Sequence, residues 1–345
     1  MPPANRSTRV NGPLVVQEIH RPPAPFLRYV DQVVGTNHPG IEYKFSQGVL
    51  TDLDVDVVHV LDANLDLLLG TSGETPLHRL LAVLALTRNL RRHRIALVRT
   101  IDETTCRVER HTLSRLACRL LDKSTSIFIA ADTSLVSRGS SRARVIPHPH
   151  FRERFDGYPR GEQVRGRMLI IAPGSELSDD AISLLALPSV ATVPGLTLRL
   201  AGTASGPLRK SIQSAMARSR STLSARFERI SDGASVQEFD AAELVLLPKA
   251  RSSADLQTLF LALSLERPVL TPRTDLTMSI ANSVGHGWLF LSEGPLTAQT
   301  IDGTFAALRE SDRARQPDLT GRSLAATRDA YAALFRSAAS ATHPN

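Results

Sequence analysis

Short apolar runs that alternate with helix-like segments are the feature that most restricts the fold of this chain. Residues 55–61 form a β-branched run, which is typical of a strand buried on both faces of a parallel sheet. Thr75 and a following proline then begin a helix that extends to Asn89, with the threonine as N-cap. Residues 95–100 form the next strand. Strands separated by helices predict right-handed crossovers and a parallel α/β sheet.

The same alternation runs through all 345 residues, which suffices for two domains of about 150 residues each. A charged segment broken by glycine and proline, residues 152–166, divides them. We therefore expect domains at residues 1–160 and 161–320 and a C-terminal helix within 321–345. The expected strands are residues 14–19, 41–45, 55–61, 95–100, 126–130, 143–146, 167–172, 196–201, 225–230, 244–247, 269–270 and 288–291. The expected helices are residues 25–34, 75–89, 104–121, 179–187, 208–218, 236–242, 254–265, 298–310 and 321–338.

Several classes of protein are excluded by composition. Two cysteines cannot form a disulfide framework or a thiolate metal cage, so a reducing, cytoplasmic setting is expected. The longest uncharged run, residues 181–198, contains Pro188 and Pro194 and does not resemble a membrane span. Residues 1–13 lack the apolar core of a signal peptide.

The net charge of +7 comes mainly from the first half of the chain, where residues 1–165 carry 23 basic and 17 acidic side chains. Between Glu74 and Asp102 there is no acid, but there are six arginines. This arginine-rich helix could contact the headgroups of an anionic membrane surface, or it could be an ordinary solvated basic helix. Nucleic acid is not expected as a partner, because aromatic residues make up only 5% and do not interleave with the arginines.

Five segments carry a resemblance to a known family. They are residues 56–60 (DVVHV), 98–103 (VRTIDE), 145–150 (VIPHPH), 241–248 (AAELVLLP) and 261–270 (LALSLERPVL). Their type and order resemble the retaining glycosyltransferases of the GT-B fold, in particular the family 4-like enzymes that build bacterial surface polysaccharides.

The resemblance implies an α/β fold of two Rossmann-like parallel-sheet domains facing a cleft. Residues 1–160 would be the acceptor-side domain and residues 161–320 the nucleotide-sugar-side domain, with the helix of 321–345 packing back toward the N-terminal domain. The implied activity is transfer of a sugar from a nucleotide-sugar donor to a polysaccharide or glycolipid acceptor. Such an enzyme would be cytoplasmic and peripheral at the inner face of the plasma membrane. No cofactor and no metal is expected.

The donor would be bound by loops that follow the strands of the second domain. Lys249 and Arg251 follow residues 244–247 and would face the diphosphate; the alternative is a pair of solvated loop charges. Ser252 and Ser253 would donate hydrogen bonds at the start of the next helix, or simply cap it. The expected donor-binding residues are Gly174, Gly202, Lys249, Arg251, Ser252, Ser253, Asp255 and Gln257.

Two residues are candidates for catalysis. Asp102 ends a parallel strand and would accept a proton from the acceptor, or it is a turn residue or helix N-cap. His148, in the expected hinge, would donate to a phosphate or a sugar hydroxyl, or it is a loop histidine satisfied by the backbone. The expected acceptor-binding residues are Asp62, Asn64 and Glu103.

One loop departs from the family pattern. Residues 172–180, after the first strand of the second domain, hold three acids and no base, where a basic pair is expected against the diphosphate. Like charges within a few ångströms disfavour binding of a diphosphate. The alternative reading is therefore a catalytically degenerate relative that acts as a binding or scaffold protein.

Overall fold

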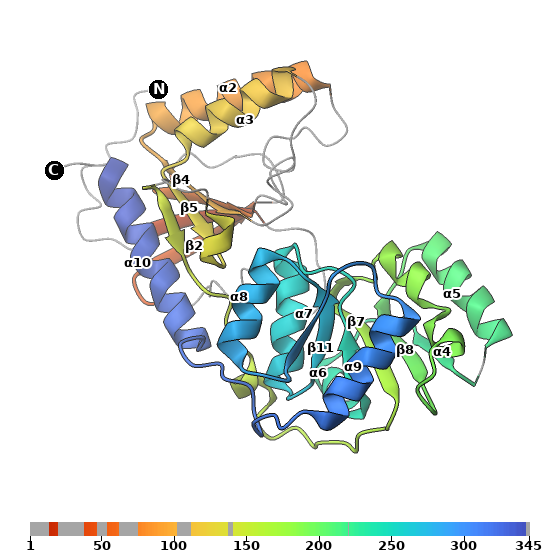
Figure 1. Cartoon of the computed structure of the whole chain (residues 1–345). Coiled ribbons are helices and arrows are strands. Elements are labelled where there is room, and N and C mark those ends of the chain that lie inside the picture. Colours follow the sequence, from red (N-terminus) through yellow and green to blue (C-terminus); the bar gives the residue numbers. More distant parts are fainter. Residues whose placement is uncertain are drawn as a thin grey trace. The chain divides into compact units, whose positions relative to one another are not determined.

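The computed structural model describes residues 14–19, 38–46, 54–61, 75–101, 112–136, 141–219 and 221–342. These residues form two compact units (Figure 1). Unit 1 contains the described residues up to Pro147 and those from Ala325 onward, and unit 2 contains His148–Leu324. The expected helix at residues 25–34 lies outside the described residues.

Unit 1 is built on a six-stranded sheet in the order β2-β1-β3-β4-β5-β6, in which every neighbouring pair is parallel. The first of these strands in the sequence, β1, has β2 on one side, and β3 to β6 follow in order on its other side. The strands are β1 Leu14–Ile19, β2 Ile41–Ser46, β3 Val57–Leu61, β4 Ala96–Ile101, β5 Ile127–Ala130 and β6 Ala143–Val145. The helices are α2 Pro76–Arg92, α3 Thr112–Ser124, the 3₁₀ turn η4 Thr133–Leu135 and α10 Leu324–Thr342.

Helix α2 forms where the sequence predicts it, and for the expected reason. The Thr75 hydroxyl accepts a hydrogen bond from the His78 backbone N–H, and Pro76 occupies the first turn. Its inward residues recur every three or four positions, so one stripe of the helix is buried. Arg94, with φ of 53°, ends the segment ahead of β4.

The sheet of unit 1 is covered on both faces. Val58 and Val60 of β3 share a buried cluster with side chains of α2 and α3. His59, between these valines, contacts Tyr331 and Phe335 of α10 at ring-centroid distances of 5.8 and 5.3 Å. Because successive side chains of a strand point to opposite faces, α2 and α3 cover one face of this sheet and α10 covers the other (Figure 1).

Unit 2 contains a second parallel six-stranded sheet, in the order β12-β11-β10-β7-β8-β9. Its strands are β7 Arg167–Glu176, β8 Thr197–Thr203, β9 Leu223–Arg226, β10 Leu244–Leu246, β11 Val269–Pro272 and β12 Leu289–Ser292. Its helices are η5 Arg152–Phe155, η6 Asp179–Leu184, α4 Leu187–Val190, α5 Gly206–Arg218, α6 Asp232–Ala241, α7 Ser253–Ser264, α8 Asp275–Val284 and α9 Ala298–Glu310.

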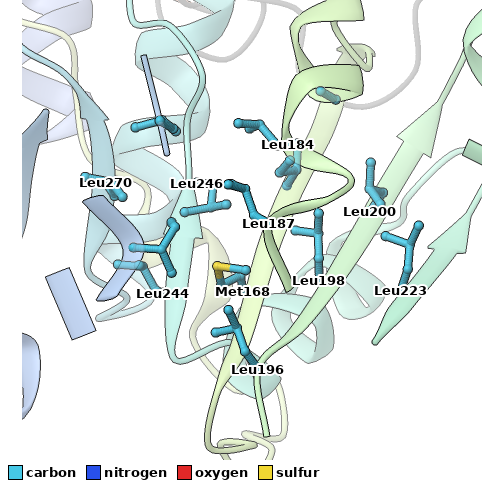
Figure 2. Packing of buried hydrophobic residues seen from close by; sticks show 14 of the residues in the cluster. Met168, Leu184, Leu187, Leu196, Leu198, Leu200, Leu223, Leu244, Leu246 and Leu270 are labelled. Atoms are coloured by element: carbon cyan, nitrogen blue, oxygen red, sulfur yellow. The ribbon is translucent and has the colours of Figure 1, made fainter. Parts of the chain in front are cut away.

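One core cluster of unit 2 lies between the sheet and the helices of a single face. Figure 2 shows Met168 of β7 among leucines from neighbouring strands, with Leu187 and Leu184 beside them. Helices α5 and α9 contribute Ile212 and Phe305 to the same cluster. Helices α6 and α7 contact β7 but contribute nothing to this cluster, so they cover the opposite face. Unit 2 is thus a helix–sheet–helix sandwich like unit 1.

Two expectations about elements of unit 2 are wrong, and one helix is missing from the expected elements. The helix expected at residues 179–187 is the 3₁₀ helix η6 followed by the short α4, because Pro188 cannot donate the hydrogen bond that a continuous helix needs. The strand expected at residues 225–230 is β9, shifted toward the N-terminus. Helix α8 was not expected; its capping box joins Thr274 to Thr277 in place of the usual glutamate or glutamine.

Residues 152–166 are attached to unit 2 by ion pairs, although residues 156–165 are exposed. Arg154 pairs with Asp232 at 2.9 Å, and Arg160 pairs with Asp240 at 2.8 Å. Asp240 is fully buried and also accepts the Gly161 backbone N–H at 2.7 Å. A buried carboxylate that lost these partners would be strongly destabilised. The charges of this segment therefore attach it to α6 of unit 2.

Candidate functional site

The topology of unit 2 marks one edge of its sheet as the place for a ligand. The chain builds β7, β8 and β9 in one direction and then returns to place β10 on the other side of β7. In open parallel sheets the crevice at such a reversal, beyond the carboxyl ends of the strands, is where ligands bind. The loops that follow β7 and β10 lie at this switch point.

The two loops meet through an ion pair. Lys249, after β10, places its Nζ 2.9 Å from Oδ2 of Asp180, after β7. Both side chains are about half exposed. The hydrogen bond from Lys249, followed by that from Ser178, lowers the pKa of the Asp180 carboxyl below its usual range. Asp180 therefore compensates the charge of Lys249, and an anionic ligand must displace this carboxylate to reach the ammonium group.

The start of α7 lies in the same loop. Ser252 is the N-cap, and its hydroxyl accepts the Asp255 backbone N–H at 3.2 Å. The Asp255 carboxylate in turn accepts the backbone N–H groups of Ser252 at 2.9 Å and Arg251 at 3.1 Å. Ser253 is the first residue of the helix. The capping role predicted for Ser252 is therefore present, and Asp255 occupies N–H donors that a phosphate would otherwise use.

Gln257 follows in the second turn of α7 and is 5% exposed. Within the described part of the chain, its Nε2 has no hydrogen-bond partner. A buried amide left unsatisfied costs about 1–3 kcal/mol, so such groups often have a ligand or water as their partner. This position suits the predicted role of Gln257 in donor binding.

Gly174 and Gly202 lie where β7 and β8 diverge. Ala172 pairs with Gly202, but the next pair joins Glu176 to Thr203, so residues 173–175 bulge out of the strand. Gly202 has φ of 138°, and a Cβ there would lie 3.0 Å from the Ala172 carbonyl oxygen. Only glycine suits this close approach. Bulges of this kind are frequent beside active sites, because they redirect the backbone that follows.

His148 is buried rather than exposed. The imidazole is 2% exposed and stacks on Phe260 at 5.3 Å, and its Nδ1–H donates to the Pro149 carbonyl at 3.0 Å. Burial lowers the pKa of His148 from 6.5 to about 4, although the Pro149 hydrogen bond opposes the shift and nearby Arg322 adds to it. The side chain is therefore neutral at pH 7. Its hydrogen bond to the Pro149 carbonyl is the backbone contact expected of a loop histidine without a ligand.

The candidates of the first domain fall in segments that the structure does not describe. Asp62, Asn64, Asp102 and Glu103 all lie outside the described residues. The strands that precede them are described: β3 and β4 are parallel neighbours, and Leu61 pairs with Thr100. Their carboxyl ends thus lie side by side, at one edge of the sheet.

Two further features concern the kind of site that the described residues can hold: clusters of metal-binding side chains and helices that could span a membrane. Within the described residues, no group of three or more His, Cys, Asp and Glu side chains is placed to hold a metal ion. None of the described helices combines the length and the apolarity needed to cross a membrane.

The structure thus brings Lys249, Arg251, Ser252 and Asp255 into one loop and adds Asp180, which was not among the expected site residues. A signal for Asp180 was present in the sequence: an acidic loop and a basic loop each follow an apolar strand. The partnership becomes visible only with the strand order, which places β10 beside β7.

A search of curated proteins finds a clear relative. The chain is 30% identical over 230 residues to the GDP-mannose:glycolipid 4-beta-D-mannosyltransferase of Xanthomonas campestris pv. campestris. The match covers 65% of this chain and 64% of the relative, so it spans slightly less than two thirds of the relative's length. No family model matches the chain.

Solved structures share the fold over nearly the whole chain. The Anabaena protein HepE in complex with UDP matches with a TM-score of 0.57 and 13% identity, over 94% of this chain and 95% of that one. AviGT4, a glycosyltransferase involved in avilamycin A biosynthesis, matches with a TM-score of 0.50 and 14% identity, over 95% of this chain and 98% of that one. The predicted fold class is confirmed: two Rossmann-like parallel sheets with flanking helices, as in GT-B glycosyltransferases.

Proposed function

We propose that this protein is a glycosyltransferase that moves a sugar from a nucleotide-sugar donor to a glycolipid or glycan acceptor. The observation that carries the proposal is the 30% identity over 230 residues to a GDP-mannose:glycolipid mannosyltransferase. GDP-mannose is accordingly the first donor to test, and a lipid-linked saccharide is the first acceptor. The fold is compatible with this activity, but many functions share it, so the proposal depends on the relative and on the site.

The proposed donor site is the switch point of unit 2. The diphosphate would displace Asp180 from Lys249 and take the ammonium group as its partner. The amide of Gln257 and the first-turn N–H groups of α7 other than those bound by the Ser252 and Asp255 side chains would supply hydrogen-bond donors. Catalysis would then come from positioning the donor and from stabilising the charge that develops on the leaving diphosphate. No metal and no cofactor is part of this proposal.

Asp102 keeps its proposed role at the acceptor. His148 is proposed as a positioning residue: its neutral imidazole has one N–H, at Nδ1, which donates to the Pro149 carbonyl and is not available to a phosphate. It would act by holding Phe260 and the start of unit 2 in place.

The retaining, family 4-like mechanism is also part of the proposal. It predicts that the new glycosidic bond has the anomeric configuration of the donor. The relative's name specifies a beta linkage. A β-linked product from an α-linked donor would mean inversion and would contradict this part of the proposal. The one-bond carbon–proton coupling constant at the anomeric carbon, in the NMR spectrum of the product, distinguishes the two configurations.

The proposed location is the cytoplasmic face of a membrane, with the enzyme attached peripherally. A lipid-linked acceptor requires access to a membrane, and the low cysteine content suits a reducing compartment. Fractionation of cells that produce the full-length protein tests this: it should pellet with membranes and be released by high salt.

A degenerate binding or scaffold protein is the second candidate, and the Asp180–Lys249 pair favours it. The Asp180 carboxylate already neutralises Lys249 and competes with a diphosphate for it, which lowers the affinity of the proposed donor site for a diphosphate. Such a protein would retain the fold and bind a glycan or a partner without transferring a sugar.

A transfer assay decides between these candidates. Purified full-length protein is incubated with GDP-mannose or other nucleotide-sugars and with glycolipid acceptors dispersed in detergent, and products are detected by mass spectrometry. The transferase predicts a product that is lost in Lys249→Ala but kept in Lys210→Ala, which changes an exposed lysine of helix α5. Equilibrium binding of the glycolipid acceptor is measured separately, and acceptor binding without any product would favour the scaffold. Absence of any product would contradict the transferase, and absence of acceptor binding as well would contradict a scaffold that holds a glycan.

A further inference from the structure

Helices α2 and α3 of unit 1 expose a group of leucines that the fold does not use. In α2 the spacing of the exposed leucines is four and then three residues, so they form one stripe along the helix. In α3 two exposed leucines stand three residues apart. We call these five residues the leucine patch: Leu77 (54% exposed), Leu81 (55%), Leu84 (43%), Leu113 (39%) and Leu116 (44%).

The five leucines belong to one surface. Helices α2 and α3 are neighbours that contact each other along their length (Figure 1). Both bury their inward residues in the same cluster against β3 and β4, with Val83 from α2 and Leu121 from α3 as examples. Their outward faces therefore look away from the same face of the sheet.

The direction of the helices places the patch at a particular edge of unit 1. In a parallel sheet each crossover helix runs antiparallel to the strands, so α2 and α3 run parallel to each other. Four of the leucines lie in the N-terminal halves of their helices, and Leu84 lies at the middle of α2. The N-terminal end of each helix adjoins the carboxyl ends of β3 and β4. The leucine patch thus flanks the edge of the sheet at which β3 and β4 end, ahead of the expected acceptor residues in the sequence.

Positive charge accompanies the leucines. Arg88, Arg91 and Arg92 are exposed on α2, and Arg115 and Arg119 are exposed on α3. Asp122 is the only acid in the two helices, and it pairs with Arg99 of β4. Leucines beside arginines on one helical face suit the boundary of an anionic bilayer, where apolar side chains insert shallowly and guanidinium groups remain at the headgroups.

We propose that the leucine patch and these arginines bind the surface of an anionic lipid bilayer and bring the edge of β3 and β4 to a lipid-borne acceptor. The inference builds on the proposed function, because an acceptor with a lipid tail must be met at a membrane. It assigns the contact to specific side chains, which the charge pattern of the sequence alone does not do. The near absence of acids favours a partner surface of uniformly negative charge, which is what an anionic bilayer presents.

Vesicle co-sedimentation tests the surface directly, without donor or acceptor. Full-length protein is mixed with vesicles of phosphatidylcholine alone or of phosphatidylcholine with phosphatidylglycerol, at low and at high salt. We expect binding to the anionic vesicles that weakens with salt. The variant Leu77→Gln/Leu81→Gln/Leu84→Gln should bind the anionic vesicles more weakly, by a factor of roughly ten or greater. The variant Arg88→Glu/Arg92→Glu should lose the salt-sensitive part of the binding.

Matched changes on unit 2 serve as controls. Val164→Gln/Val190→Gln replaces equally exposed apolar residues, and Lys210→Glu/Arg218→Glu reverses exposed charges on α5. Both controls should bind vesicles like the unchanged protein. Thermal unfolding of all variants confirms that the exposed substitutions leave the fold intact.

Several results would overturn the inference: no binding to anionic vesicles, equal binding by the leucine variant, or equal losses in the controls. Sedimentation equilibrium adds one more, since a dimer that only the leucine variant dissociates would assign the patch to a second copy of the chain. Transfer to an acceptor dispersed in detergent is measured separately. Failure of that transfer with intact vesicle binding would count against the proposed function and not against the leucine patch.

Discussion

His148 illustrates how one side chain depends on its surroundings. It lies between Phe260 and Phe151, with ring-centroid distances of 5.3 and 5.7 Å, and Arg322 donates to its carbonyl oxygen at 3.2 Å. Arg322 also lies over the ring of Phe260, 4.7 Å from the ring centroid. A charged imidazole in this stack would be desolvated and would lie near a guanidinium group. The stack therefore requires the neutral form.

This requirement predicts acid sensitivity. The pKa of His148 is about 4 in the folded protein and 6.5 in the unfolded chain, so the unfolded chain binds the extra proton first as the pH falls. The free energy of unfolding should decrease between about pH 6.5 and pH 4, by roughly 3 kcal/mol in total from this group. Urea unfolding at several pH values measures it.

His148→Gln should make the pH dependence of unfolding shallower in that window, whatever its own effect on stability at pH 7. His286→Gln, which changes an exposed histidine in the loop after α8, is the control and should leave the slope as it is. Parallel curves for the unchanged protein and His148→Gln would contradict the assignment.

At the scale of single elements, the divergence of β7 and β8 depends on one glycine. Gly202 holds φ of 138°, and the space that a Cβ needs is taken by Ala172. Gly202→Ala should destabilise the protein by roughly 1–3 kcal/mol through backbone strain and crowding. Because the bulge of residues 173–175 is built on this pair, the same change should also weaken nucleotide binding.

Gly206→Ala is the matched control for this prediction. Gly206 begins α5, its φ is not positive, and a Cβ added there would have open space around it. The substitution should be neutral or stabilise by a few tenths of a kcal/mol. Equal melting temperatures for the two variants would show that Gly202 carries no special strain.

The comparison of elements also shows what the sequence can predict. Helix α9 matches its expected range because Thr297 caps it and its apolar residues recur with helical spacing. Local signals fail in two cases: Thr277 replaces the usual partner of a capping box in α8, and Pro188 interrupts the segment after β7. The residue types of the candidate site were predictable from loops after apolar strands. The pairing of Lys249 with Asp180 was not, because it depends on which strands are neighbours.

The molecule as a whole has two cores, and the chain returns to the first one at its end. Helix α10 belongs to unit 1, where Tyr331 and Phe335 are fully buried against β3. Among the described residues, unit 1 therefore combines segments from before and after unit 2, while unit 2 is the segment His148–Leu324.

Tyr331→Ala tests this division. Removing a fully buried aromatic side chain costs roughly 3–5 kcal/mol. We expect hydrogen exchange to accelerate in β3 and β4 of unit 1, with little change in β7 and β10 of unit 2. Ser337→Ala, on the exposed side of α10, should change neither unit. Equal acceleration in both sheets would mean that the two units unfold as one.

The central claim is that the reversal of strand order in unit 2 holds a nucleotide diphosphate on Lys249, against competition from Asp180. Calorimetric titration of the full-length protein with GDP and with UDP tests it most directly, in the unchanged protein, Asp180→Asn and Lys249→Ala. The account predicts that Asp180→Asn binds at least one nucleotide more tightly than the unchanged protein and that Lys249→Ala binds it more weakly. Identical affinities in all three proteins, or no binding by any of them, would contradict it.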